Sequence, residues 1–228
     1  MNDFQERLYI IFAAIFIASL VACNLIFKKF FNIDFFGYPF IQSVGLIAYP
    51  ITFIVTDLIS ELYGKKRANQ VVVAGFCASV FTVLLVYISI NIPILEPGSD
   101  PILEPGSPVS QDTFEAVFGL AGPAFFASMV AYLTAQFIDV RIFHFWKKLT
   151  NGKHLWLRNN GSTIASQLVD TTLVICILFI GVWDSSQLVS AIIDGWLFKM
   201  LMAFIDTPII YGIIHLLKGK IDIAIVEE

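Results

Sequence analysis

Charged residues are scarce in this sequence of 228 residues. Lys, Arg, Asp and Glu together make up 14% of it, whereas soluble domains carry about 25%. Apolar residues make up 57%, and the mean hydropathy is +0.80. A soluble fold of this length needs more polar surface than this composition supplies. The composition therefore argues against an ordinary soluble domain and predicts a polytopic protein whose main partner is the lipid bilayer.

Cysteine and histidine are also rare, with three residues of each. Cys23, Cys77 and Cys176 lie in apolar stretches, without a second Cys or a His at the spacing of a metal site. We expect three small buried hydrophobic residues and neither a metal, a cofactor nor a disulfide framework. No basic run is long enough to predict a nucleic acid partner.

Motifs of nucleotide hydrolysis and of common hydrolases are missing as well. The sequence has no Walker-type glycine-rich loop, no Gly-x-Ser-x-Gly and no His-Glu-x-x-His. An intramembrane aspartyl pair of Asp57 and Asp170 is an alternative, but the usual local motifs of such enzymes are absent. We therefore expect no catalytic residues and no enzymatic activity.

Long apolar runs, in contrast, are abundant. A helix needs about 20 apolar residues to cross roughly 30 Å of bilayer hydrocarbon. The sequence predicts an all-α fold, with residues 1–228 forming a single six-helix transmembrane domain. The predicted spans cover approximately residues 8–27, 40–62, 71–92, 116–138, 161–182 and 188–217.

The distribution of Lys and Arg predicts the orientation of these spans. Eleven of these residues lie in the N-terminal segment, the second and fourth loops and the C-terminal segment. Only Lys28 and Lys29 lie in the first loop, and the third and fifth loops have none. Because basic loops stay on the cytoplasmic side, we expect a multi-pass protein of the plasma (inner) membrane with both termini in the cytoplasm.

The third predicted loop, residues 93–113, contains a tandem repeat. The heptapeptide PILEPGS occupies residues 93–99 and again residues 101–107. Pro and Gly break helices, and exposed loop tips accept insertions at little cost. We interpret the repeat as a duplication in a tolerant outer loop, with an outer lid as the alternative.

Polar residues inside the predicted spans are the candidates for function, because a charge at mid-helix costs about 3 kcal/mol on insertion. Thr163, Gln167 and Asp170 form one polar stripe on the fifth span, and Lys199 and Asp206 share a face of the sixth. Carboxylates, amides and aromatic walls together suit a small planar molecule that carries N–H donors or a positive charge.

The candidate set also includes paired residues on other spans. Asp57 and Glu61 are four residues apart and therefore share one helical face. Asn160 or Ser162 is expected to cap the fifth helix. Tyr49 is interpreted as part of the interfacial aromatic belt, and the alternative for one or two aromatics of this belt is stacking on a planar ligand. The predicted substrate-binding residues are Asn24, Asp57, Glu61, Gln136, Asn160, Gln167, Asp170, Lys199 and Asp206. Asp139 and Arg158 are predicted structural or gating charges.

Three ordered motifs resemble the signatures of the queuosine precursor transporter family, also called the vitamin uptake transporter family. The first, YPITFIVTDLISELYG, covers residues 49–64 and is followed by Lys-Lys-Arg. The second, RNNGSTIASQLVD, covers residues 158–170, and the third joins Lys199 to DTPIIY at residues 206–211. The resemblance runs along nearly the whole chain, except for the repeat at 93–107.

The resemblance implies six helices related to the substrate-binding subunits of energy-coupling-factor vitamin importers. It also implies uptake of 7-deazaguanine bases, precursors of the modified tRNA nucleoside queuosine, which carry a cyano, an aminomethyl or a larger group. On this hypothesis, carboxylates such as Asp170 accept the N–H donors of the base, and amides such as Gln167 read its remaining edge.

A second hypothesis is a substrate-binding subunit for another small vitamin-like or nucleobase-like molecule, which requires a separate energising complex. Ala13, Ala14 and Ala18 only loosely approach the Ala-rich docking motif that such subunits often carry. A homo-oligomer and an energising subunit both stay open as partners. A membrane enzyme or a structural membrane protein is the third hypothesis.

Overall fold

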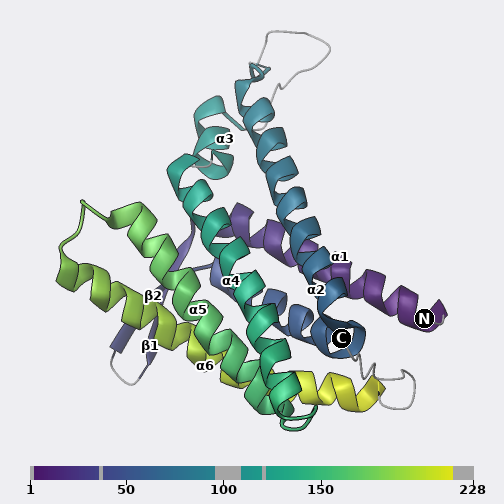
Figure 1. Cartoon of the computed structure of the whole chain (residues 1–228). Helices are drawn as coiled ribbons and strands as arrows, with labels where there is room; N and C mark the ends of the chain where they lie inside the picture. The colour runs from purple at the N-terminus through teal and green to yellow at the C-terminus, as the bar shows by residue number, and fades with distance from the viewer. Residues whose placement is uncertain (1–2, 36–37, 96–108, 120–121, 218–228) are drawn as a thin grey trace.

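The computed structural model describes residues 3–35, 38–95, 109–119 and 122–217, most of which are helical (Figure 1). The helices are α1 (Asp3–Ile26), α2 (Gly45–Asn91), α3 (Gln111–Phe118), α4 (Gly122–Leu149), α5 (Leu155–Phe179) and α6 (Ser185–Leu217). An antiparallel hairpin of β1 (Phe30–Phe35) and β2 (Tyr38–Ser43) connects α1 to α2. The predicted helical architecture is confirmed, and the hairpin is an element that the apolar runs did not predict.

Helix α2 consists of two helices that meet at Gly64. This residue has φ 80° and ψ 172°, a backbone conformation that is essentially restricted to glycine. A straight helix of 47 residues would be about 70 Å long, more than twice the hydrocarbon thickness. The break instead turns the chain, and the two parts of α2 run in different directions (Figure 1).

Within the described residues, four helices are long and apolar enough to cross a membrane: Asp3–Ile26, Ile47–Asn91, Leu155–Phe179 and Ser185–Leu217. Between 6% and 33% of the residues in their most apolar stretches are buried inside the protein. The rest turn outward, as Phe81, Leu84 and Phe204 do, and such surfaces need lipid around them. The chain is therefore a multi-pass membrane protein. Helix α4, which contains most of the fourth predicted span, is not among these four.

The interior of the bundle is rich in polar side chains. All nine buried residues of α5 are polar, and α5 packs between α4 and α6. An apolar cluster, with Phe16, Leu58 and Tyr132 among its members, joins α1, α2 and α4 beside it. Polar side chains are costly inside a membrane protein, so the buried polar residues are the candidates for function.

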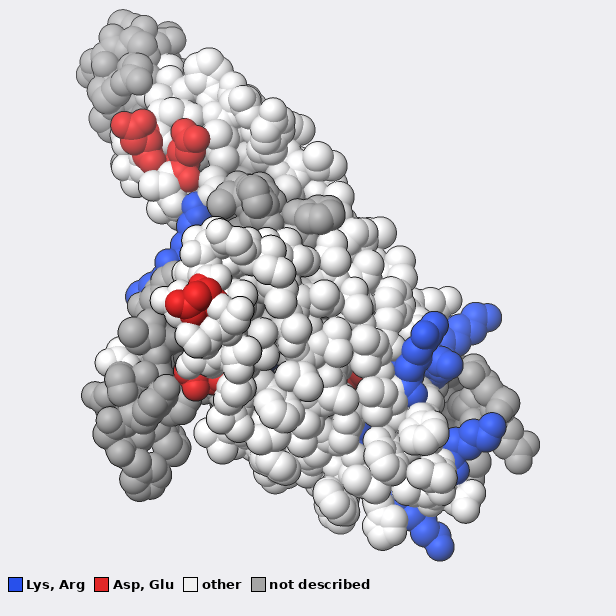
Figure 2. All heavy atoms as spheres, turned by 60° about the vertical axis from the view of Figure 1, so that its left-hand side comes forward, with Lys and Arg blue, Asp and Glu red and all other residues white. Residues whose placement is uncertain are grey.

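The loops that the sequence assigns to one side of the membrane lie at one end of the bundle. The Tyr63 hydroxyl donates to the Gln5 carbonyl at 2.9 Å, and the Lys147 ammonium donates to the Glu61 carbonyl at 3.1 Å. These bonds bring together the start of α1, the Gly64 break and the end of α4. Figure 2 shows the larger group of Lys and Arg side chains at one end of the molecule, which we call the basic end, and a smaller group on the other side.

At the opposite end, the first loop contacts the segment before α4. The Lys28 ammonium donates to the Ala116 carbonyl at 2.9 Å and also to the Gly119 carbonyl. Helix α3 is capped by Ser110, whose hydroxyl accepts from the Thr113 amide. Most of the tandem repeat falls on residues 96–108, outside the described residues, so its interpretation as an outer loop stays a prediction.

Several predicted boundaries are wrong by a few residues. Residues 40–43 belong to β2, and the helix of the second span begins at Gly45. Residues 116–118 belong to α3, and α4 continues to Leu149. Helix α5 begins at Leu155, so Asn160 and Ser162 lie inside it and do not cap it. The polar start of α5 can be helical because its side chains find partners inside the bundle.

The prediction that all three cysteines are buried is correct only for Cys23. Cys77 is exposed and Cys176 is partly exposed. Both lie on membrane helices, where an apolar thiol side chain can face lipid as readily as the protein interior.

Candidate functional site

A small cavity lies between the first part of α2, the middle of α5 and α6. Its volume is about 20 Å³, which is room for one water molecule. The residues that line it are Tyr49, Pro50, Phe53, Thr163, Gln167, Phe198, Lys199, Met202, Ala203 and Asp206. Aromatic and apolar walls with a few polar groups are typical of a small-molecule site, although such sites hold about 300 Å³ or more when open. The lining makes the cavity a candidate site, and a molecule larger than water can bind there only if the cavity widens.

Asp170, Lys199 and Tyr49 form a polar unit beside this cavity. The Lys199 ammonium lies 2.5 Å from Oδ2 of Asp170, and the Tyr49 hydroxyl donates to the same oxygen at 2.8 Å. The ammonium also lies 5.0 Å from the centre of the Tyr49 ring, within the range of a cation–π contact. Three helices are thus joined by one buried carboxylate.

Gln167 is the most conspicuous polar group of the cavity wall. Its side chain is 2% exposed, and neither Oε1 nor Nε2 has a hydrogen-bond partner in the described part of the chain. A buried amide without partners costs about 1–3 kcal/mol for each unsatisfied group. An amide in this state is suited to binding a molecule that enters the cavity.

Asp206 also lines the cavity and has no ion pair. The residue is 7% exposed, and no hydrogen bond or salt bridge joins its carboxylate to another described residue. Lys199, two turns earlier on α6, is already bound to Asp170. The predicted common face of Lys199 and Asp206 is confirmed, because both residues reach the same cavity.

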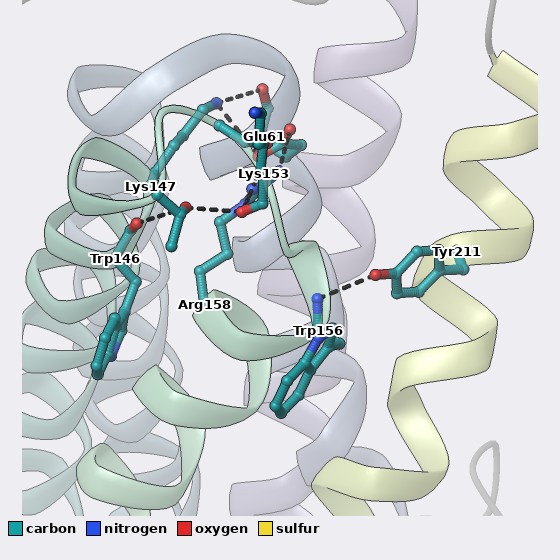
Figure 3. A network of polar contacts seen from close by, with 9 residues as sticks. Glu61, Trp146, Lys147, Lys153, Trp156, Arg158 and Tyr211 are labelled. Atoms are coloured by element: carbon teal, nitrogen blue, oxygen red, sulfur yellow. Dashed lines mark hydrogen bonds and ion pairs between the residues drawn. The ribbon is translucent and has the colours of Figure 1, made fainter.

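A second polar cluster, around Glu61, lies at the basic end of the bundle (Figure 3). The Arg158 guanidinium binds Oε1 of Glu61 at 2.6 Å, and the Lys147 ammonium lies 3.2 Å from Oε2. Arg158 also donates to the carbonyls of Gly152 and Lys153 at 2.9 and 3.2 Å. Glu61 does not line the cavity, and its contacts hold α2, α4 and α5 together.

Asp57, Gln136 and Asp139 lie between the cavity and this basic end. The Asp57 carboxyl is buried beside that of Asp139. The Ser166 hydroxyl donates to Asp139 at 3.0 Å, and the Thr56 hydroxyl donates to Gln136 at 3.3 Å. These contacts link α2, α4 and α5 through buried polar side chains.

The two other predicted amides lie outside the cavity wall. Asn160 donates to the Thr207 hydroxyl at 2.7 Å and to the Trp156 carbonyl at 2.9 Å, so it links α5 to α6. The amide nitrogen of Asn24 is buried and has no described partner. Of the predicted binding residues, Gln167, Lys199 and Asp206 line the cavity, and Asp170 contacts it through Lys199.

The sequence predicts aromatic walls but does not identify the residues that form them. Tyr49, interpreted above as part of the interfacial belt, lines the cavity with Phe53 and Phe198. A signal was available, because Tyr49, Phe53 and Asp57 follow at i, i+4 and i+8 and therefore share a helical face.

The sequence is similar to known membrane transport proteins. The family described as "Putative vitamin uptake transporter" matches residues 43–213, three quarters of the chain. A protein of Bacillus subtilis (strain 168), "Probable queuosine precursor transporter", is 28% identical over 195 residues, which cover 85% of this chain and 79% of that relative. No solved structure matches the chain. The family match includes every residue of the cavity wall, and this chain belongs to the vitamin uptake transporter family, as a membrane transport protein and not an enzyme.

Proposed function

We propose that this transporter imports queuosine precursors, which are 7-deazaguanine bases, into the cytoplasm for salvage into tRNA. The observation that carries this proposal is the similarity to the Bacillus subtilis protein over 85% of the chain. The resemblance of residues 49–64, 158–170 and 199–211 to the family signatures supports it. The cavity agrees in chemistry, since aromatic walls bind a planar ring and polar groups fix its orientation.

In this proposal, Gln167, Asp170, Lys199 and Asp206 form the substrate-binding group. The planar base lies among Tyr49, Phe53 and Phe198 when the cavity opens. Asn24, Asp57, Glu61, Gln136 and Asn160 stay predicted binding residues, and the positions of Asp57 and Gln136 suit a route from the cavity toward the basic end. Arg158 and Asp139 keep their predicted structural or gating role.

The proposed topology has six spans: α1, the two parts of α2 on either side of Gly64, α4, α5 and α6. The basic end then faces the cytoplasm of the inner membrane, together with both termini, as the positive-inside rule requires. A relationship to the substrate-binding subunits of energy-coupling-factor importers is part of the same proposal.

Uptake of a labelled deazaguanine by bacteria that lack their own importer tests this function. Expression of the chain is expected to produce saturable uptake, and Asp170→Asn is expected to abolish it while the variant still reaches the membrane. Asp184→Asn, in an exposed turn between α5 and α6, is the matched control and retains uptake. Lack of uptake with the unmodified chain would contradict the function, whereas normal uptake with Asp170→Asn would contradict the site.

Reconstitution separates an autonomous transporter from a subunit that depends on an energising complex. Liposomes that contain only this chain are expected to accumulate or equilibrate the labelled base. Binding of the base without any transport in the same liposomes would favour the dependent subunit.

A further inference from the structure

The cavity wall contains more negative charge than positive charge. Lys199 is the one cation among the described residues that line it, and its ammonium is bound to Asp170. The Asp206 carboxylate lines the same cavity without an ion pair. A buried carboxylate without a partner is costly, so the site lacks one positive charge.

The surroundings of Asp206 increase this deficit. Asp57, on α2, is close enough for its carboxylate to interact electrostatically with that of Asp206. The neighbouring groups from α5, Thr163 and Gln167, are neutral, and so are Tyr49 and Phe53 from α2. Lys199 is the one positively charged group among the described residues of the cavity wall, and Asp170 already neutralises it. A bound monocation would therefore offset the remaining negative potential.

Gln167 points independently to a ligand. Its buried amide has one donor group and one acceptor group, both without partners, at the same cavity. A planar ring with a lactam edge presents an adjacent N–H and C=O that satisfy both groups at once. The cavity thus has two chemically different unmet requirements: one for a positive charge and one for an amide-like edge.

Building on the proposed function, we propose that Asp206 binds a protonated amine of the substrate while Gln167 hydrogen-bonds the lactam edge of its ring. The Lys199–Asp170 ion pair stays intact when the substrate binds, so Asp206 is the carboxylate that pairs with the amine. Asp206 is then a specificity-determining residue, and the site selects amine-bearing precursors over neutral precursors with the same ring.

A pair of ligands that differ only in charge tests this inference. Purified protein in detergent is titrated with the 7-aminomethyl and the 7-cyano forms of 7-deazaguanine, and the two Kd values are compared. We expect the unmodified chain to bind the aminomethyl base at least about tenfold more tightly, as buried charge pairs do. Asp206→Asn is expected to remove this preference by weakening aminomethyl binding, while cyano binding changes less than about threefold.

Three further variants sharpen the comparison. Asp206→Glu retains the charge and is expected to keep the preference, which guards against a folding defect in Asp206→Asn. Gln167→Ala is expected to weaken the binding of both ligands to a similar degree. Asp184→Asn is expected to change the binding of neither ligand. Equal affinities in the unmodified chain, or equal losses for both ligands in Asp206→Asn, would overturn the inference. Binding of neither ligand would instead contradict the proposed function.

Discussion

At the residue scale, the Lys199–Asp170 ion pair lies at the wall of the cavity. Removal of one partner from a buried pair leaves an uncompensated charge, which costs about 3–5 kcal/mol. We expect Lys199→Met to lower the stability of the purified protein by about this amount, as measured by thermal unfolding in detergent. The double variant Lys199→Met with Asp170→Asn is expected to recover part of the loss, because no unpaired charge remains.

The unmodified protein, the two single variants and the double variant form a double-mutant cycle, which is the control for this prediction. The coupling between the two positions is expected to be of the order of 1–3 kcal/mol. Strictly additive losses would show that the 2.5 Å contact between the ammonium and the carboxylate contributes nothing to stability.

Arg158 is a residue for which we expect a structural role without substrate binding. Its guanidinium is buried against Glu61 and two loop carbonyls, whereas Lys147, the second partner of Glu61, is 18% exposed in its side chain. We expect Arg158→Met to destabilise the protein by about 3–5 kcal/mol and Lys147→Met by less than about 1 kcal/mol. Thermal unfolding of both variants measures the difference.

The same pair of variants distinguishes a structural role from a gating role. A structural Arg158 lowers the unfolding temperature and the amount of folded transporter together. An Arg158→Met variant with normal stability and lost uptake would assign Arg158 to gating instead.

At the element scale, the break at Gly64 sets the direction of the second part of α2 relative to the first. Its backbone conformation is essentially closed to residues with a Cβ atom, so Gly64→Ala is expected to cost about 1–3 kcal/mol. Gly212→Ala on α6 is the matched control, because an added Cβ there has nothing within 4 Å and alanine favours helix. Folded yield and unfolding temperature should therefore fall for Gly64→Ala only. Equal behaviour of the two variants would contradict a structural need for the break.

Hydropathy predicts the helices but not all of their ends. The apolar runs locate the helices, whereas the polar stretch from Arg158 to Asn160 lies outside the predicted fifth span. Its side chains instead bind Glu61 and Thr207 from neighbouring helices. Residues 158–160 are therefore helical, although their low hydropathy predicts a loop, because partners distant in sequence satisfy their polar side chains.

At the scale of the whole molecule, the separation of charge predicts orientation. The loop between α4 and α5 carries Lys153 near the basic end, and the turn between α5 and α6 carries the exposed Asp184. In a background with Cys23, Cys77 and Cys176 changed to Ala, Asp184→Cys is expected to react with a membrane-impermeant maleimide in intact cells. Lys153→Cys is expected to react only after the cells are lysed. The reverse pattern would place the basic end outside.

The sequence by itself determined the membrane class, the location of the helices and the family resemblance, because hydropathy, loop charge and short motifs are local properties. The tertiary structure decided which polar residues meet. Tyr49 and Asp170 are 121 residues apart, yet they share a hydrogen bond, and Glu61 is drawn to Arg158 instead of the cavity. No periodicity predicts such partners, since the angles at which helices pack determine them. The same packing leaves Gln167 and Asp206 at the cavity without a partner among the described residues.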